Sequence, residues 1–145
     1  MSYSLTYSQA VLVVVYVADK IRQGFYDYVP TRAIATSLGI PAPTTAKILQ
    51  ALGRAGLIET REGAKGGVRL AVPAADVSLR DILDALEHKR PLFQTHAHVR
   101  AKGERPTRAQ AAIGRALDGA EQAMRAELAR TSVEDILAHF PARPR

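Results

Sequence analysis

Residues 30–72 carry the strongest fold signal and read PTRAIATSLGIPAPTTAKILQALGRAGLIETREGAKGGVRLAV. The apolar spacing predicts one short helix over residues 30–39 and a second from Pro43 to Ala55. Gly39 and Pro41 favour a tight turn between them, because glycine accepts a left-handed backbone and proline suits a helix start. This spacing is typical of a helix-turn-helix, although an ordinary helical hairpin has the same pattern.

A predicted β-hairpin follows the second helix. Residues 57–61 and 68–72 have the composition of strands, and the glycine-rich segment 62–67 separates them. A hairpin in this position is typical of the wing of a winged helix. A phosphate-binding nucleotide loop is the disfavoured alternative, because the GxxxxGK[ST] motif is absent and a strand follows the glycines.

The remaining periodic segments are helical. We expect a helix over residues 5–23, a short one from Leu79, the longest over 107–130 and a last short one from Val133. The longest helix carries an apolar stripe that its own small domain cannot cover, which favours pairing with a second chain. A surface helix packed on its own domain is the alternative. The stripe consists of Ile113, Leu117, Ala120, Met124 and Leu128.

These elements predict a mainly α fold with a small β-hairpin wing and a long C-terminal dimerisation helix. We divide the chain into a winged helix-turn-helix domain (1–88), a basic, sensor-type loop (89–106) and the dimerisation helix with its short C-terminal helix (107–145). The longest apolar run, Ala10 to Ala18, has nine residues, too few to span a bilayer, and the start lacks the basic region of a signal peptide. We expect a cytoplasmic location and no membrane partner.

Composition narrows the function classes. The 145 residues suit one domain, and the net charge of +6 suits a polyanion partner. The excess lies in two patches, because residues 28–72 hold six basic residues against two acidic ones, and residues 89–108 hold six against one. The chain has no cysteine, which excludes disulfides, thiolate chemistry and iron–sulfur clusters held by its own thiolates.

The order of these pieces resembles one family along nearly the whole chain, from about Leu5 to Leu137. The segments that carry the resemblance are Ile34 to Pro41, Lys47 to Ile58, Gly66 to Ala71, Val77 to Glu87 and Leu128 to Leu137. Together they are similar to the IscR/NsrR/CymR (Rrf-two type) family of bacterial winged-helix transcription factors. The resemblance implies a dimer whose long helices cross, with the second helix of the helix-turn-helix and the wing on operator DNA.

Two departures limit what the resemblance implies. Many members hold an iron–sulfur cluster with three cysteines in the loop before the long helix, whereas residues 88–106 contain none. The family wing often reads Arg-Gly-Pro-Gly-Gly-Gly-Tyr, whereas this chain has EGAKGGV at residues 62–68. We therefore expect no cluster, no other cofactor and no metal, and the family's sequence preference does not transfer to this wing.

The expected partner is a double-stranded DNA operator. Long basic side chains on the second helix and the wing would contact phosphates, while Thr44, Thr45 and Gln50 are the expected base readers. Because strong base readers are few, DNA shape should supply part of the specificity. The predicted DNA-binding residues are Pro43, Thr44, Thr45, Lys47, Gln50, Arg54, Arg61, Lys65, Gly66 and Arg69.

We expect a dimeric, sequence-specific regulator of the repressor type. An anionic effector or a protein partner would bind the basic loop near Lys89, Arg90, Arg100 and Lys102. A metal- or small-molecule-responsive regulator, with a metal at His88, His96 and His98, is one alternative. A partner-binding module with weak DNA recognition is another. We do not expect an enzyme, because no pattern places a nucleophile beside a base.

Overall fold

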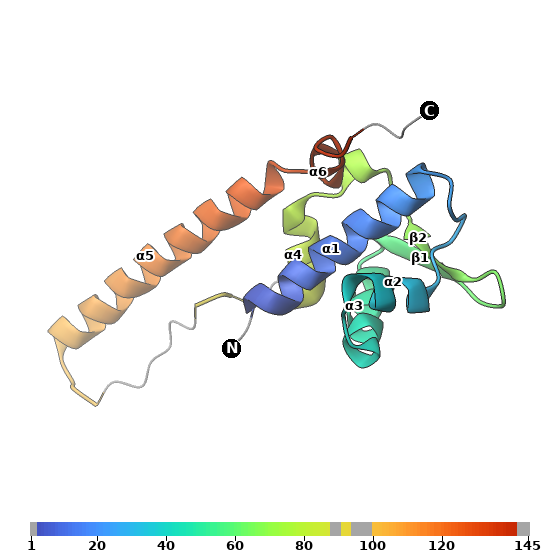
Figure 1. Cartoon of the computed structure of the whole chain (residues 1–145). Coiled ribbons are helices and arrows are strands. Elements are labelled where there is room, and N and C mark those ends of the chain that lie inside the picture. Colours follow the sequence, from blue (N-terminus) through green and yellow to red (C-terminus); the bar gives the residue numbers. More distant parts are fainter. Residues whose placement is uncertain (1–2, 88–90, 94–99, 142–145) are drawn as a thin grey trace.

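The computed structural model describes residues 3–87, 91–93 and 100–141. Figure 1 shows a body of helices and a two-stranded hairpin, from which a long helix extends as an arm. This architecture confirms the predicted fold class. In chain order the elements are α1 (Tyr3–Arg22), α2 (Thr31–Leu38), α3 (Ala42–Arg54), β1 (Ile58–Arg61), β2 (Gly67–Leu70), the 3-10 helix η1 (Ala74–Asp76), α4 (Leu79–Glu87), α5 (Glu104–Ala129) and α6 (Val133–Leu137).

Helix α1 is the centre of the body. Its valine-rich run favours a strand by propensity, yet Ala10, Val13, Val14 and Val17 recur at helical spacing and are fully buried. Burial of this face therefore decides in favour of a helix. The Tyr7 hydroxyl ties α1 to α4, because it donates to the Leu79 carbonyl at 2.7 Å, and burial raises the pKa of Tyr7 to about 12.

The helix-turn-helix forms as predicted. Gly39 has a φ of 65°, and the N–H of the next residue, Ile40, donates to the Ala35 carbonyl at 3.1 Å. Helix α3 then begins with prolines in and before its first turn, where a missing N–H costs no helical hydrogen bond. Ile34 of α2 and Ile48 of α3 are at most 1% exposed, so the two helices meet in the core.

The predicted hairpin is confirmed as an antiparallel pair of β1 and β2, with Thr60 opposite Val68. Val29, which precedes α2, joins β2 through two hydrogen bonds to Val68, of 2.8 and 2.9 Å. This close approach needs glycine at position 67. Its φ is 150°, and an added Cβ would collide with the Val29 carbonyl.

The chain returns to the body after the arm. The N–H of Val133 donates to the Val77 carbonyl at 2.8 Å, and the N–H of Leu79 donates to the Thr131 carbonyl at 2.9 Å. Val133 and Leu137 of α6 are buried in the core of the body. The short C-terminal helix thus packs on the winged-helix body.

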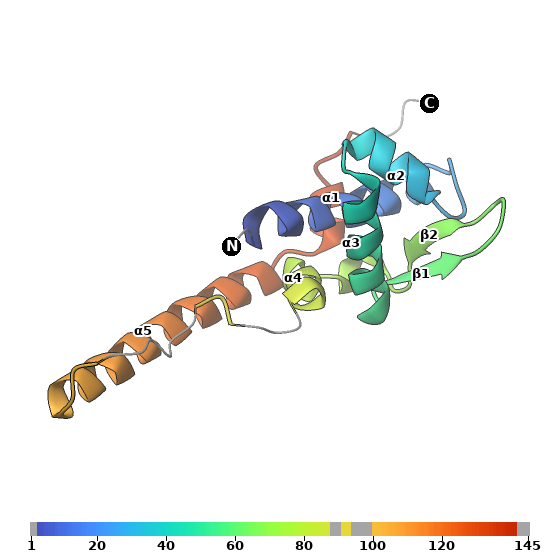
Figure 2. The same cartoon turned by 90° about the horizontal axis from the view of Figure 1, so that it is seen from below.

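The arm begins earlier than predicted. Helix α5 starts at Glu104, three residues before the expected Thr107, because Pro106 is accommodated in the first turn. The Thr107 hydroxyl does not cap the helix; it donates to the Gly103 carbonyl at 3.0 Å, one turn back. Figure 2 shows, from below, that most of α5 projects beyond the body. Among the described helices, none has the length and apolar content that crossing a membrane requires.

We expect Gly67→Ala to lower the free energy of unfolding by about 3 kcal/mol, because the new Cβ would push the wing away from Val29. Urea unfolding followed by circular dichroism measures the change. Gly53→Ala is the matched control, since an added Cβ there meets no atom within 4 Å and alanine favours the helix. Equal stability of the two variants would contradict the assigned role of Gly67.

Candidate nucleic-acid interface

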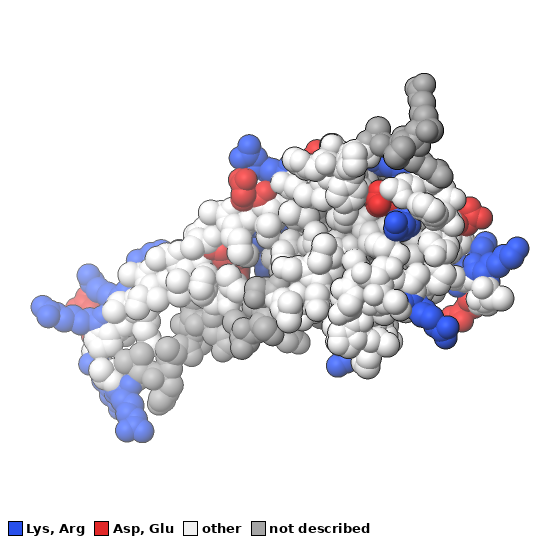
Figure 3. Space-filling model, viewed as in Figure 1, with Lys and Arg blue, Asp and Glu red and all other residues white. Residues whose placement is uncertain are grey.

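The outer face of α3 presents polar side chains to solvent. Because Ile48 and Leu52 face the core, Lys47, Gln50 and Arg54 lie on the opposite side and are exposed. Figure 3 shows Lys and Arg side chains below the α3 region and along the wing, with acidic side chains among those of the wing. The predicted spacing of these three α3 residues is therefore realised as one accessible face.

The first turn of α3 differs from the prediction at one residue. Thr45 is 0% exposed, and its hydroxyl donates to the Pro41 carbonyl at 3.1 Å, with the Ile40 carbonyl at 3.5 Å. A side chain held in this way reaches no base, so the prediction of Thr45 as a base reader is wrong. Its neighbours Pro43 and Thr44 are exposed and half-buried, respectively.

A shallow groove runs between α3 and the wing. Its volume is about 570 Å³, and both Gln50 and Arg54 line it from the α3 side. The groove therefore brings two of the predicted DNA-binding residues to one surface together with the hairpin. Its other lining residues include Thr31, Leu49, Thr60 and Val68.

The two arginines of the wing are held by neighbouring groups. The guanidinium carbons of Arg61 and Arg69 lie 4.2 and 4.6 Å from the centre of the Tyr28 ring. Arg69 is ion-paired with Glu59, and this hydrogen bond raises the pKa of Arg69. Arg61 donates to the Lys65 carbonyl at 3.0 Å. The arginines are thus oriented along the wing, although both remain exposed.

Sequence reasoning missed Tyr28 and Glu59 as the groups that orient these arginines. The hairpin register would have identified Glu59, because it stands directly opposite Arg69 in the ladder. Tyr28 lies before α2 and meets the wing only through the fold, so no local pattern indicates it.

Two of the predicted DNA-binding residues, Lys65 and Gly66, lie in the wing turn and differ in their surroundings. Lys65 is exposed at the turn. The N–H of Gly66 donates to the Gly63 carbonyl at 2.9 Å, and a Cβ at residue 66 would collide with the Arg61 carbonyl. Gly66 therefore shapes the turn, and its N–H is already used there.

The predicted dimer stripe lies along the arm. Ile113 is 56% exposed, Ala120 is exposed, and Leu117, Met124 and Leu128 are partly exposed. Large apolar side chains left open along one helix are typical of a surface that a partner covers. In the described residues, α5 packs on the body chiefly through α4.

Of the residues predicted for an effector, Arg100 and Lys102 are exposed. Lys89 and Arg90 lie outside the described residues, as do His88, His96 and His98. Within residues 3–87, 91–93 and 100–141, no three histidine, aspartate or glutamate side chains are placed to hold a metal ion.

The profile of one protein family, Rrf2, described as "Iron-dependent Transcriptional regulator", matches residues 3–139. The protein slr0846 of Synechocystis, provisionally named an HTH-type transcriptional regulator, is 36% identical over 80 residues, which cover 54% of this chain and 54% of slr0846. The chain thus spans about half the length of this curated relative.

Solved structures share the fold. A provisionally named transcriptional regulator from Lactobacillus plantarum superposes with a TM-score of 0.73 at 22% identity, covering 92% of this chain and 88% of that one. IscR of T. potens superposes with a TM-score of 0.63 at 18% identity, covering 99% and 94%.

The family description raises the question of iron. The chain has no cysteine, so it supplies no thiolate ligand, and the described residues bring no acidic or histidine cluster together. These residues do not fit a cluster held by thiolates of this chain. Three observations indicate one family: the profile match over residues 3–139, the helix-turn-helix and the wing. The chain belongs to the Rrf2 family of transcriptional regulators.

Proposed function

We propose that this protein is a cytoplasmic, dimeric repressor that binds a specific duplex operator without an iron–sulfur cluster. The observation that carries the proposal is the exposed row of Lys47, Gln50 and Arg54 on α3, beside the groove that leads to the wing. A helix presents such a row to the major groove, while the wing reaches the neighbouring backbone. A dimer would then read two half-sites.

The exposed residues divide into two roles. Lys47, Arg54 and Lys65 would contact phosphates, which position the protein without reading sequence. Gln50 is the strongest base reader that remains after Thr45 is withdrawn, because its amide can pair with adenine. With Thr44 as the only other polar reader of this turn, we expect part of the specificity to come from DNA shape.

An effector of anionic character, or an acidic protein, would bind near Arg100 and Lys102 together with Lys89 and Arg90. The charge of residues 89–108 favours this class of ligand over a metal cation. A metal at His88, His96 and His98 remains the alternative, and zinc titration of the purified protein distinguishes the two.

We expect Lys65→Ala to weaken binding on every duplex and to reduce the salt slope by about 0.9, because one phosphate contact is lost. Gln50→Ala should instead relax preference at one or two positions, at a cost of about 1–3 kcal/mol in discrimination. Selection from random duplexes, followed by affinity measurements over a range of salt concentrations, tests both.

Arg108→Ala is the control for this comparison, because it removes the same charge from the arm, far along the chain from α3. Its salt slope should match that of the unmodified protein. If Lys65→Ala and Gln50→Ala lose affinity identically on all duplexes, the assignment of roles fails. If no duplex is enriched at all, the protein is a partner-binding module with weak DNA recognition.

For the dimer, we expect Leu117→Glu to yield monomers at micromolar concentration, because a charge would enter the apolar stripe of α5. Ala111→Glu introduces the same charge at an exposed position on another side of the helix and should leave the dimer intact. Light scattering measures both masses. A monomeric unmodified protein, or a Leu117→Glu dimer, would contradict this interface.

A further inference from the structure

Arg125 is the buried residue of α5, which the structure describes along its whole length. Its exposed fraction is 8%, whereas most residues of this helix are open to solvent. A guanidinium is costly to bury unless charged partners surround it. Neither solubility nor general packing therefore explains why Arg125 is buried.

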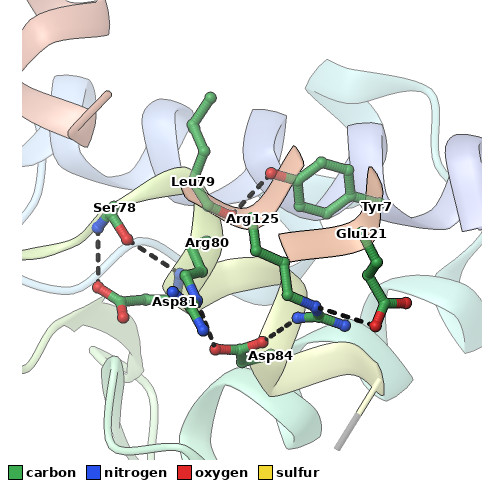
Figure 4. Close-up of polar contacts among 8 residues, drawn as sticks. All are labelled: Tyr7, Ser78, Leu79, Arg80, Asp81, Asp84, Glu121 and Arg125. Atoms are coloured by element: carbon green, nitrogen blue, oxygen red, sulfur yellow. Dashed lines mark hydrogen bonds and ion pairs between the residues drawn. The ribbon is translucent and has the colours of Figure 1, made fainter. Parts of the chain in front are cut away.

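Two helices supply partners of Arg125 among the described residues. Its Nη1 donates to Asp84 Oδ1 of α4 at 2.5 Å, and its Nε lies 3.9 Å from Glu121 Oε2 on α5 itself. Arg80 of α4 approaches the other oxygen of Asp84 at 3.7 Å. Figure 4 shows these groups converging between the two helices. We call Arg80, Asp84, Glu121 and Arg125 the ionic joint.

The loop between α4 and α5 joins the same cluster. The backbone N–H of Leu92 donates to Oε1 of Glu121, the oxygen that does not face Arg125 Nε. Leu92 lies in the described segment 91–93, between α4 and the basic residues that precede the arm. One carboxylate thus touches both the loop and the guanidinium that holds the arm.

The arm has a second attachment further along the chain. The hydrogen bond from Leu79 N–H to the Thr131 carbonyl, 2.9 Å long, holds the end of the arm to the start of α4. Thr131 is six residues beyond Arg125 and two beyond Ala129, the last residue of α5. Two attachments at different points restrict the direction of the arm relative to the body.

We propose that Arg125 is a positioning residue: through Asp84 it sets the direction of the arm relative to α3, and Glu121 transmits changes in segment 91–93 to that direction. The inference rests on the proposed function for its consequence, because in a dimer the arm direction sets the separation of the two α3 helices. Buried ion pairs often add little net stability, and their directional geometry suits this role.

The test measures a distance within one chain that changes with the angle of the arm. The chain has no cysteine, so Thr36→Cys on α2 and Ala116→Cys on the arm, both at exposed positions, are unique sites for nitroxide spin labels. Double electron–electron resonance, with excess unlabelled protein to isolate distances within one chain, then reports the arm direction. We expect Arg125→Met to broaden this distance distribution and shift its maximum, because methionine keeps apolar contact but loses the ion pairs.

Arg108→Met is the matched control, since Arg108 pairs with Glu104 on the exposed surface of the same helix. It should leave the distribution unchanged. Arg125→Lys keeps the charge and should restore part of the original distance. An effect on folding alone would not depend on whether the charge is kept. Glu121→Ala should broaden the distribution as well, because it releases Leu92.

Circular dichroism establishes that each variant is folded before its distances are compared. A folded Arg125→Met protein with the unmodified distance distribution would overturn the proposal. If that variant fails to fold, Asp84→Asn, which removes the charge that Arg125 pairs with, decides on the same criterion. An unchanged distribution in Glu121→Ala would overturn the part assigned to the loop. These distances need no DNA and no dimer, so failure of duplex binding would count against the proposed function alone.

Discussion

Burial of the apolar face of α1 holds the other elements of the body in place. Val13, Val14 and Val17 are fully buried, and side chains from each surrounding element pack into the same core. Apolar burial is not directional, but close packing of interlocking side chains makes one arrangement favourable. The core residues contributed by other elements include Ile34, Ile48, Leu52, Val68, Ile82 and Val133.

The surface proposed for DNA follows from that core. Once Ile48 and Leu52 face the core, the helical period leaves Lys47, Gln50 and Arg54 outside. The same orientation of α3 about its axis places Thr45 on the inner face, where a backbone carbonyl accepts a hydrogen bond from its hydroxyl. The wing is set similarly, because Val29 and Val68 pair only where Gly67 lets the backbones approach.

The arm differs from the body in how far its apolar side chains are buried. Helix α5 has a stripe of large apolar side chains, but its own chain covers only part of it. Its attachment to the body includes a few directional contacts, namely the ionic joint and the backbone bonds around Thr131. Contacts of this kind hold an angle while contributing modestly to stability, which suits an element whose direction matters more than its burial.

Local sequence determined most of the elements. Gly39 and the prolines before Lys47 marked the helix-turn-helix, and the glycines of residues 62–67 marked the wing, because these residues restrict the backbone by themselves. The absence of cysteine excluded a thiolate-held cluster without any structure.

Other features arose only from tertiary contacts. The valines of α1 became a helix because neighbours buried one helical face, against their propensity. Thr45 turned inward, Tyr28 met two arginines and α6 returned to the body because residues distant in sequence supplied their partners. Arg125 is the clearest example of a feature that arises only from tertiary contacts. In the sequence it is one more charge on a long helix, and only the approach of Asp84, 41 residues earlier, makes it part of a buried ion pair.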